Sequence, residues 1–432
     1  MKREIIFYSI LNLIIGLTGI VIRPLIPIVS KDINIGLDMI GIVLFAISFG
    51  FFISVILTGY LSDRYGTKLT IALGLLISII SSLGFGLTYT FFILLISGLL
   101  MGIGRGTLMA GINAHVVNIY PEKRGANLLK LSSFFCLGTA IGTFIVSIIL
   151  FLKLNWRFSF IIFFFIYIFI TLYFLRKKAT EHKISLQEEK NTNSLQDEQI
   201  KDFNKEDIKN IENHGITSIK NQLEKIHLKE YLNLFKNPII IFSGILLIFF
   251  GGTVVAFSTW YTTYFSSFGI KVAVSSLGLS LYWLSLMAGV KLKQIAMNFL
   301  EEYQIILLGC LLNAIFMIII TFSGNIVIKV IASIMIGLFL GGFTPLTTSL
   351  AISQKPELSG FISGYILGIL ALGNMIFQPF IGYFSERFGR GSGIYIQLTG
   401  SLLLFITTVI LAIFYKNKRE NSSPFKGLGE SL

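Results

Sequence analysis

Long apolar runs, separated by short polar connectors, dominate the pattern of this chain. Twelve runs reach about 18 residues or more, the length at which a helix can cross the hydrocarbon core of a bilayer. They lie at roughly 5–29, 39–61, 69–89, 91–119, 128–152, 157–175, 238–265, 275–297, 303–323, 327–352, 360–384 and 392–415. The first run is too long for the core of a signal peptide, so we expect a retained helix. The sequence predicts an all-α integral membrane protein with twelve transmembrane helices.

One polar stretch interrupts this pattern between the sixth and seventh runs. It is rich in Lys, Glu, Asn and Gln and offers little apolar surface to bury, which is typical of a solvated linker. We therefore expect a six-helix bundle at 1–175, a cytoplasmic linker at 176–237, a second six-helix bundle at 238–416 and a cytoplasmic tail at 417–432. A plain tether and a regulatory segment are both open for the linker.

Charge predicts the orientation. Short loops and tails hold fourteen Lys and Arg residues on one side and seven on the other, and the linker adds bases to the first side. By the positive-inside rule, we expect both termini on the cytoplasmic side of the membrane. The expected membrane is a plasma membrane of bacterial or archaeal type. The net charge of +13 is spread over these loops, so no nucleic-acid partner is expected. Cys136 and Cys310 have no disulfide or metal spacing, and we expect no metal and no cofactor.

The two halves share a pattern of small residues. A shift of 235 residues superposes glycines of the fourth and fifth runs on glycines of the tenth and eleventh, namely Gly102 on Gly337, Gly106 on Gly341 and Gly138 on Gly373. The same shift lays PEKRG at 121–125 on PELSG at 356–360. A repeat of this kind predicts two pseudo-symmetric six-helix bundles.

The connector after the second run reads GYLSDRYGTK and resembles the signature of the major facilitator superfamily. That family follows its second helix with Gly-x-Leu-x-Asp-Arg-x-Gly and further bases, matched here by Gly59, Leu61, Asp63, Arg64, Gly66 and Lys68. NWRF at 155–158 and GGFTP at 341–345 also fit. The resemblance covers the chain outside the linker. It implies a secondary transporter, and not an enzyme, that alternates between inward-open and outward-open states around a central site.

Within this gating motif, Asp63 is expected to be a latch. A carboxylate beside a helix N-terminus is favoured by about 0.3–1 kcal/mol, and the family implies that the partner is the eleventh helix. Gly59 and Gly66 allow backbones to approach at a tight turn, while Arg64 and Lys68 can bind lipid phosphates or a carboxylate. An ordinary positively charged turn is the alternative.

The second half has no such latch. Its copy of the motif keeps Gly289, Lys291 and Lys293 but has no acid. GYFSERFG at 382–389 looks like a better copy, yet it follows the eleventh run and therefore faces the other side. We expect a latch on one side only.

Charged residues inside the runs are few. None of the twelve runs contains Asp or Glu, which disfavours a membrane carboxylate for proton coupling or for binding cationic drugs without excluding either. His115 is the remaining possible proton site, or else a packed residue. Arg105 lies near the middle of its run, where a charge costs on the order of 3 kcal/mol. A substrate role and a structural bond to backbone carbonyls are both open for it.

Further candidates lie near Arg105 in the predicted bundle. Arg23, within RPLIP, can snorkel to a surface, and its two neighbouring prolines kink the helix and free carbonyls. Asn113 is about 80° round the helix from Arg105 and can share a cavity wall. Tyr282 and Trp283 lie deep in the eighth run and could stack on a sugar or another planar solute.

Two aromatic residues near the end of the seventh run, Trp260 and Tyr264, could line the cavity, but we expect them in an interfacial belt. The segment GINAHVVNIYPEKRG at 111–125 is similar to the corresponding part of fucose-type sugar permeases. The glycine-rich start of the same run, 91–119, is similar to that of organic-anion symporters. The chain departs from both, since Met109 and Arg105 stand where those subfamilies tend to have acids.

Together these features predict a transporter for a small organic solute, either an organic anion or a sugar-like molecule. An exporter of hydrophobic compounds and a transporter-like sensor that moves nothing are the alternatives. The expected substrate-binding residues are Arg105, Arg23, Asn113, Tyr282 and Trp283. The expected partners are a small-molecule substrate and membrane lipids, and we expect a monomer.

Overall fold

The computed structural model describes residues 2–119, 124–176, 234, 236–355 and 358–422, almost all of them in helices. The first half contains α1 (Lys2–Gly19), α2 (Ile22–Ile33), α3 (Leu37–Tyr65), α4 (Thr67–Gly86), α5 (Phe91–Ile119), α6 (Arg124–Phe151) and the helix Arg157–Arg176. The second half contains α10 (Pro238–Phe250), the π-helical turn η2 (Gly251–Val255), α11 (Ala256–Ser266), α12 (Val272–Ala296), α13 (Glu302–Phe322), α14 (Ile326–Leu340), α15 (Phe343–Ile352), α16 (Ser359–Arg387) and α17 (Gly393–Ser422).

These helices confirm the predicted fold class. Taken singly or as consecutive pairs, they make twelve spans that are long and apolar enough to cross a membrane, and the described part of the chain contains no strand. Span ends agree with the expected ones within a few residues: the predicted 91–119 is α5, for example. Most of the predicted linker lies outside the described residues, so the domain boundaries stay a prediction.

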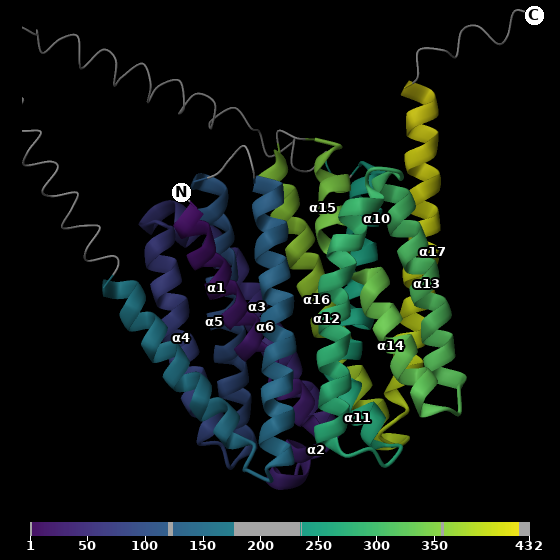
Figure 1. Cartoon of the computed structure of the whole chain (residues 1–432). Coiled ribbons are helices and arrows are strands. Elements are labelled where there is room, and N and C mark those ends of the chain that lie inside the picture. The colour runs from purple at the N-terminus through teal and green to yellow at the C-terminus, as the bar shows by residue number, and fades with distance from the viewer. Residues whose placement is uncertain (1, 120–123, 177–233, 235, 356–357, 423–432) are drawn as a thin grey trace, which may run out of the picture.

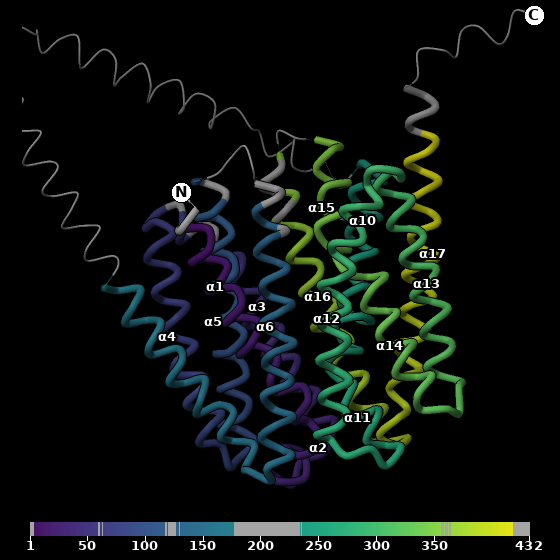
Figure 2. The backbone as a smooth tube through the Cα atoms, in the orientation of Figure 1, coloured from purple at the N-terminus to yellow at the C-terminus, as the bar shows by residue number. Residues whose placement is uncertain are grey.

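The helices form two groups that stand side by side along one direction (Figure 1). The start of α1 and the end of α17 lie at one end of the molecule, which we call the termini end. The α2 and α11 segments lie at the opposite end, which we call the far end. Figure 2 shows the same division as a purple-to-teal group and a green-to-yellow group.

Glycine contacts show that the repeat seen in the sequence is also a repeat of structure. A Cβ atom on Gly102 would collide with the carbonyl oxygen of Ile47, and one on Gly337 would lie 2.7 Å from that of Tyr282. These two carbonyls are themselves 235 residues apart. The pairs Gly138 with Leu13 and Gly373 with Ile248 follow the same rule. Both halves therefore bring equivalent helices together through equivalent small residues.

Two of the twelve spans are broken, one beside a proline and one at a glycine. The first breaks between α1 and α2, just before Pro24. The tenth breaks between α14 and α15, where Gly342 adopts a left-handed conformation with φ 72°. A third span, the seventh, stays continuous but passes through the π-helical turn η2. Breaks and π-turns free backbone groups and are frequent at functional sites.

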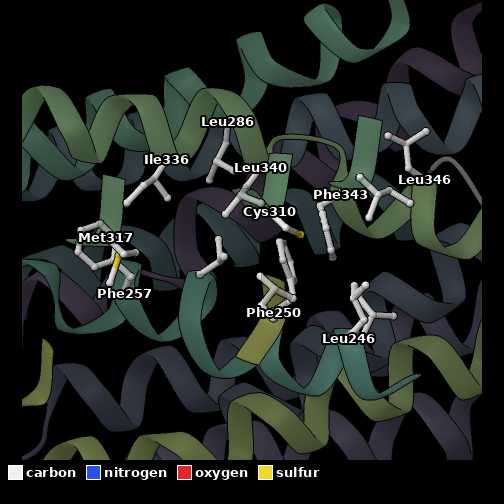
Figure 3. Packing of buried hydrophobic residues seen from close by; sticks show 14 of the residues in the cluster. Leu246, Phe250, Phe257, Leu286, Cys310, Met317, Ile336, Leu340, Phe343 and Leu346 are labelled. Carbon is white, nitrogen blue, oxygen red and sulfur yellow. The ribbon is translucent and has the colours of Figure 1, made fainter. Parts of the chain in front are cut away.

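The two halves are joined between their centre and the far end. Contacts run along α3 with α16, along α6 with α12 and between α2 and α11. Hydrogen bonds on this seam include Leu37 N to Glu386 Oε2 at 2.7 Å, Thr143 Oγ1 with Ser280 Oγ at 2.8 Å, and Ser147 Oγ to the carbonyl of Ala273 at 2.6 Å. The second half has its own apolar core, in which Phe250, Phe343 and Cys310 take part (Figure 3).

Candidate functional site

Arg23 marks the centre of the molecule. Its Nη1 donates to Ser258 Oγ of α11 at 2.8 Å, and only 5% of the residue is exposed. Ser258 is the residue that the 235-residue repeat places opposite Arg23. Equivalent residues of two halves can touch only near the axis that relates the halves, so this bond lies close to the pseudo-two-fold axis. Arg23 therefore does not snorkel to a surface but points across the seam.

The prolines beside Arg23 explain the backbone around it. Pro24 and Pro27 have no N–H to donate to the carbonyls four residues earlier, those of Ile20 and Arg23. The Ile20 carbonyl accepts instead from the N–H of Arg23 at 3.0 Å, and the Arg23 carbonyl accepts from Thr262 Oγ1 at 3.4 Å. Because the Arg23 N–H is engaged in this way, the carbonyl of Gly19 loses its helical donor. The expected freeing of carbonyls is thus present.

Arg105 of α5 reaches this opened backbone. Its Nη1 lies 3.5 Å from the carbonyl oxygen of Gly19, at the long limit of a hydrogen bond. A Cβ atom on Gly19 would lie 2.8 Å from Cδ of Arg105, so a larger residue there would require the Arg105 side chain to shift. The guanidinium carbon stands 5.3 Å from the ring centre of Phe51 and 5.6 Å from that of Phe135.

The charge of Arg105 is poorly matched by its surroundings. Its Nε is buried and makes no hydrogen bond with any described residue, and no described carboxylate pairs with it. Arg23 lies within electrostatic range and adds a second positive charge. The side chain itself remains partly exposed. The centre of the protein thus holds two guanidinium groups whose counter-charge does not come from the described chain.

The aromatic candidates differ from each other. Trp283 is turned toward the centre: its ring meets Phe135 edge-on at 6.2 Å, and its buried Nε1 has no hydrogen-bond partner among the residues that the structure describes. Tyr282 is fully buried and donates from its hydroxyl to the carbonyl of Val254 at 3.3 Å. Arg105, Phe135 and Trp283 therefore form a row across the seam, whereas Tyr282 supports the π-helical turn behind it.

A polar network beside this row was not anticipated from the sequence. Asn374 of α16 donates to Ser48 of α3 at 3.0 Å, across the two halves, and accepts from Gln378 at 2.7 Å. Gln378 also accepts from Trp260 Nε1 at 2.8 Å and donates to Thr259 at 3.3 Å. Trp260 is 3% exposed, so the expected interfacial-belt position is wrong for this residue.

The same correction applies to Tyr264, which is buried and donates to the carbonyl of Ile320 at 2.8 Å. Lys329 of α14 also donates to the Tyr264 hydroxyl, at 2.7 Å. A ring near the end of a span can face the bundle or the lipid, and the sequence does not distinguish these two directions.

The remaining candidates on α5 lie apart from the central row. Asn113 is half-buried, and its side chain makes no hydrogen bond among the described residues. His115 is buried between α1 and α4, with Nδ1 2.7 Å from Thr67 Oγ1 and its ring 4.6 Å from that of Tyr8. The structure does not bring either residue into contact with Arg105.

The gating motif is described only in part. Gly66 ends α3 with φ 82°, a left-handed conformation that favours glycine, and Arg64 and Lys68 lie on either side of it. Gly59 falls inside α3 rather than at the turn. The surroundings of Gly59 and Asp63 and the start of PELSG lie outside the described residues, so the latch stays a prediction.

Arranged in this way, the centre suits a polar solute that carries negative charge. Guanidinium groups can accept a carboxylate or phosphate in a bidentate pair, a flat apolar ring such as Trp283 can cover a planar solute, and the Asn374–Gln378 network supplies neutral polar groups. No group of three or more metal-ligating side chains occurs in the described residues.

Comparisons with known proteins agree with this architecture. The family model of the Major Facilitator Superfamily matches residues 8–376. A hexuronate transporter of Bacillus subtilis is 33% identical over 136 residues, which cover 31% of this chain and 32% of that protein. The quinolone resistance protein NorA of Staphylococcus aureus is 27% identical over 149 residues, covering 33% of this chain and 38% of NorA. The matched segment thus spans only about a third of these relatives.

Solved structures resemble the chain over nearly its whole length, although at low identity. A D-xylose–proton symporter superposes with a TM-score of 0.70 at 15% identity, covering 95% of this chain and 97% of that one. The xylose transporter XylE of E. coli, in a partially occluded inward-open conformation, gives a TM-score of 0.69 at 12% identity, covering 94% and 96%. Since the family model covers most of the sequence and the fold agrees, the chain belongs to the Major Facilitator Superfamily.

Proposed function

We propose that this protein is a secondary transporter that moves small organic anions, sugar acids foremost, by alternating access. The observation that carries the proposal is Arg105, a central guanidinium whose counter-charge is not supplied by any described side chain. An anionic substrate would supply it, because a carboxylate can accept two parallel N–H bonds and neutralise the charge. The hexuronate transporter among the relatives moves, by its name, a solute that is both a sugar and an anion.

The arrangement of the two halves supports alternating access. They are joined from the centre to the far end, and the far end is bridged by the bond from Leu37 N to Glu386. We take this arrangement as the state closed at the far end. The positive-inside rule predicts that the termini end lies on the cytoplasmic side of a plasma membrane. That state is then the inward-open one. The partners are then the solute and the surrounding lipid, and the proposed unit is the monomer.

A second candidate, export of hydrophobic compounds, has one observation in its favour. The rings of Phe51, Phe135 and Trp283 make the surroundings of Arg105 aromatic, and NorA is a quinolone resistance protein by name. Two positive charges at the centre disfavour cationic drugs, however, because such a ligand would add a third charge without a counter-ion.

Counterflow in proteoliposomes tests the proposal directly. Proteoliposomes that contain the purified protein are loaded with unlabelled galacturonate, galactose or ethidium. Entry of the same solute in labelled form is then measured for each. Galactose is the matched control, because it keeps the ring and replaces the carboxylate by a neutral group. We expect exchange of galacturonate and little of the other two. Exchange of galactose at an equal rate would remove the charge argument, and exchange of ethidium alone would establish the exporter.

A further inference from the structure

The cationic side chain of Lys293 is buried well away from the centre. Lys293 lies in the last turn of α12 and is 6% exposed. Its Nζ is buried and makes no hydrogen bond with any described residue. The ring centre of Phe343 lies 5.5 Å from Nζ. A buried amine without a partner is unusual, because such groups are normally paired or hydrogen-bonded.

The amine lies beside the break in the tenth span. Helix α14 ends when the N–H of Gly341 bonds to Gly337, and Gly342 then turns the chain into α15. The break leaves the carbonyls just before it without their helical donors. One of them, that of Phe339, lies 2.8 Å from where a Cβ on Gly309 would stand, and Lys293 Nζ lies 3.8 Å from the same point. The amine and a freed carbonyl therefore occupy one side of Gly309.

Other groups around the amine are polar but not acidic. The side-chain oxygen and nitrogen of Asn313, one turn beyond Gly309 on α13, are buried and make no hydrogen bond with any described residue. Cys310 is fully buried and lies within electrostatic range of Lys293. The segment 330–352 contains no titratable residue. The other titratable side chains on neighbouring inner helix segments are Glu302 and Tyr303 on α13, Lys130 on α6, Lys291 on α12, and Tyr415 and Lys416 on α17.

We propose that Lys293 is the proton-binding site that couples transport to a proton gradient. A proton needs no cavity, only a basic atom with acceptors that can approach and withdraw. The amine of Lys293 is such an atom, and the freed carbonyls of the α14–α15 break with the side chain of Asn313 are such acceptors. Movement of α15 about Gly342 would bring acceptors to the ammonium form in one state and take them away in the other, releasing the proton.

A row of contacts connects this site to the centre. Phe343, which faces the amine, stacks on Phe250 with ring centres 4.5 Å apart and planes 9° apart (Figure 3). Phe250 directly precedes the π-helical turn η2, in which the carbonyl of Val254 accepts from Tyr282. A change at Lys293 can therefore reach the π-helical turn η2, which contacts Tyr282 beside the central row.

The other proton candidate is less suited to this role. His115 already engages Thr67 through Nδ1 and packs on the ring of Tyr8. The inference about Lys293 rests on the proposed function, because it assigns the coupling of that transport. With a singly charged anion, one proton per substrate makes transport electroneutral, so a pH gradient alone can drive it.

The test compares driven uptake with exchange in proteoliposomes. For one coupled proton, a gradient of one pH unit, alkaline inside, raises galacturonate accumulation up to about tenfold. We expect this stimulation in the wild type and its loss in Lys293→Gln and Lys293→Met, while counterflow, which needs no net proton movement, is retained. Lys291→Gln is the matched control, since Lys291 is exposed on the same turn and should leave the stimulation intact.

The outcomes separate the two proposals. A wild type without counterflow contradicts the proposed function. A wild type with counterflow but no response to the gradient contradicts the inference, as does a Lys293→Gln variant that keeps the response. If both Lys293 variants fail to fold in detergent, substrate-driven proton uptake by the wild type is measured with a trapped pH dye from pH 6 to 9. In that assay, proton uptake supports the inference and its absence contradicts it.

Discussion

Two arginines in this protein, Arg157 and the partly exposed Arg105, lie in apolar helices, yet they differ in how completely their surroundings bind them. Arg157, at the far end, pairs with Asp32 at 2.7 Å and donates to the carbonyl of Thr88 through Nε at 2.8 Å and Nη2 at 2.7 Å. It also stacks on Tyr89 and Trp156. Arg105, at the centre, makes among the described residues one hydrogen bond of 3.5 Å, and its buried Nε has no partner there.

The difference separates an arginine that its neighbours bind fully from one that we propose binds a ligand. Leaving a buried charge unpaired costs several kcal/mol, so a chain that tolerates it at Arg105 has a reason other than folding. Arg157 binds its neighbours in every direction and has little capacity for anything else. The number of satisfied donors distinguishes the two residues.

The largest expected effect follows from removing the unmatched charge. Arg105→Ala should weaken galacturonate binding by about 100-fold, which corresponds to roughly 3 kcal/mol for a lost charge-assisted pair. Arg105→Lys keeps the charge but not the planar fork, and should lose less. The measurement is substrate-induced thermal stabilisation of purified variants, with the unliganded melting temperature as its control.

The unliganded protein should melt at the same temperature or higher in Arg105→Ala, because an unpaired charge is removed. An unchanged response to substrate would show that Arg105 holds the Gly19 backbone and does not bind the solute. A smaller loss in Arg105→Gln than in Arg105→Ala would instead indicate an uncharged substrate, since the amide keeps two donors.

At the paired arginine, the opposite result is expected. Arg157→Met should cost about 2–3 kcal/mol of stability, less than for a fully buried pair, because the Asp32 side chain is 39% exposed. Asp32→Asn should cost less again. Thermal unfolding in detergent measures both, and surviving protein should respond to substrate as the wild type does. A variant that melts normally but no longer binds would reverse the roles assigned to the two arginines.

Much of the fold could be predicted because bilayer physics limits the choices. Apolar length identified twelve spans, and glycines at equivalent positions indicated the repeat, since close helix approach in a membrane needs small residues. The break at Pro24 was also predictable, because proline removes a donor whatever surrounds it. The break at Gly342 was not, because glycine permits a left-handed turn without requiring one.

Residues of the site could be predicted only where a charged side chain lies in an apolar span. Arg105 was visible because a charge in the middle of an apolar run demands a partner. Asn374 and Gln378 were missed because neutral amides are tolerated in spans without any such demand. Lys293 was counted with the loop bases, since a lysine in the last turn of a helix usually reaches the interface. Only the packing of α12 against α14 shows that it does not.

On the latch hypothesis, Asp63 represents a third class, a charge that acts in one conformational state only. The latch hypothesis places it at the N-terminus of the eleventh helix, a contact worth about 0.3–1 kcal/mol. Asp63→Asn should therefore slow turnover several-fold while leaving the affinity for galacturonate within about twofold. Exchange rates in proteoliposomes and thermal-shift titrations separate these quantities. Transport at the normal rate would count against the latch.

The smallest effect is expected at His115, whose surroundings resemble those of Arg157 more than those of Arg105. Its Nδ1 is engaged by Thr67, and its ring packs on Tyr8. Glutamine keeps a polar group of similar length but loses the ring contact, which is worth about 0.5–1.5 kcal/mol.

His115→Gln should therefore lower the melting temperature slightly and leave gradient-driven uptake unchanged. Thr67→Val serves as the matched control, because it removes the same hydrogen bond from the other side. If His115→Gln abolished the response to a pH gradient while Thr67→Val did not, the proton would be carried in the first half of the molecule. Lys293 would then have to be explained by packing alone.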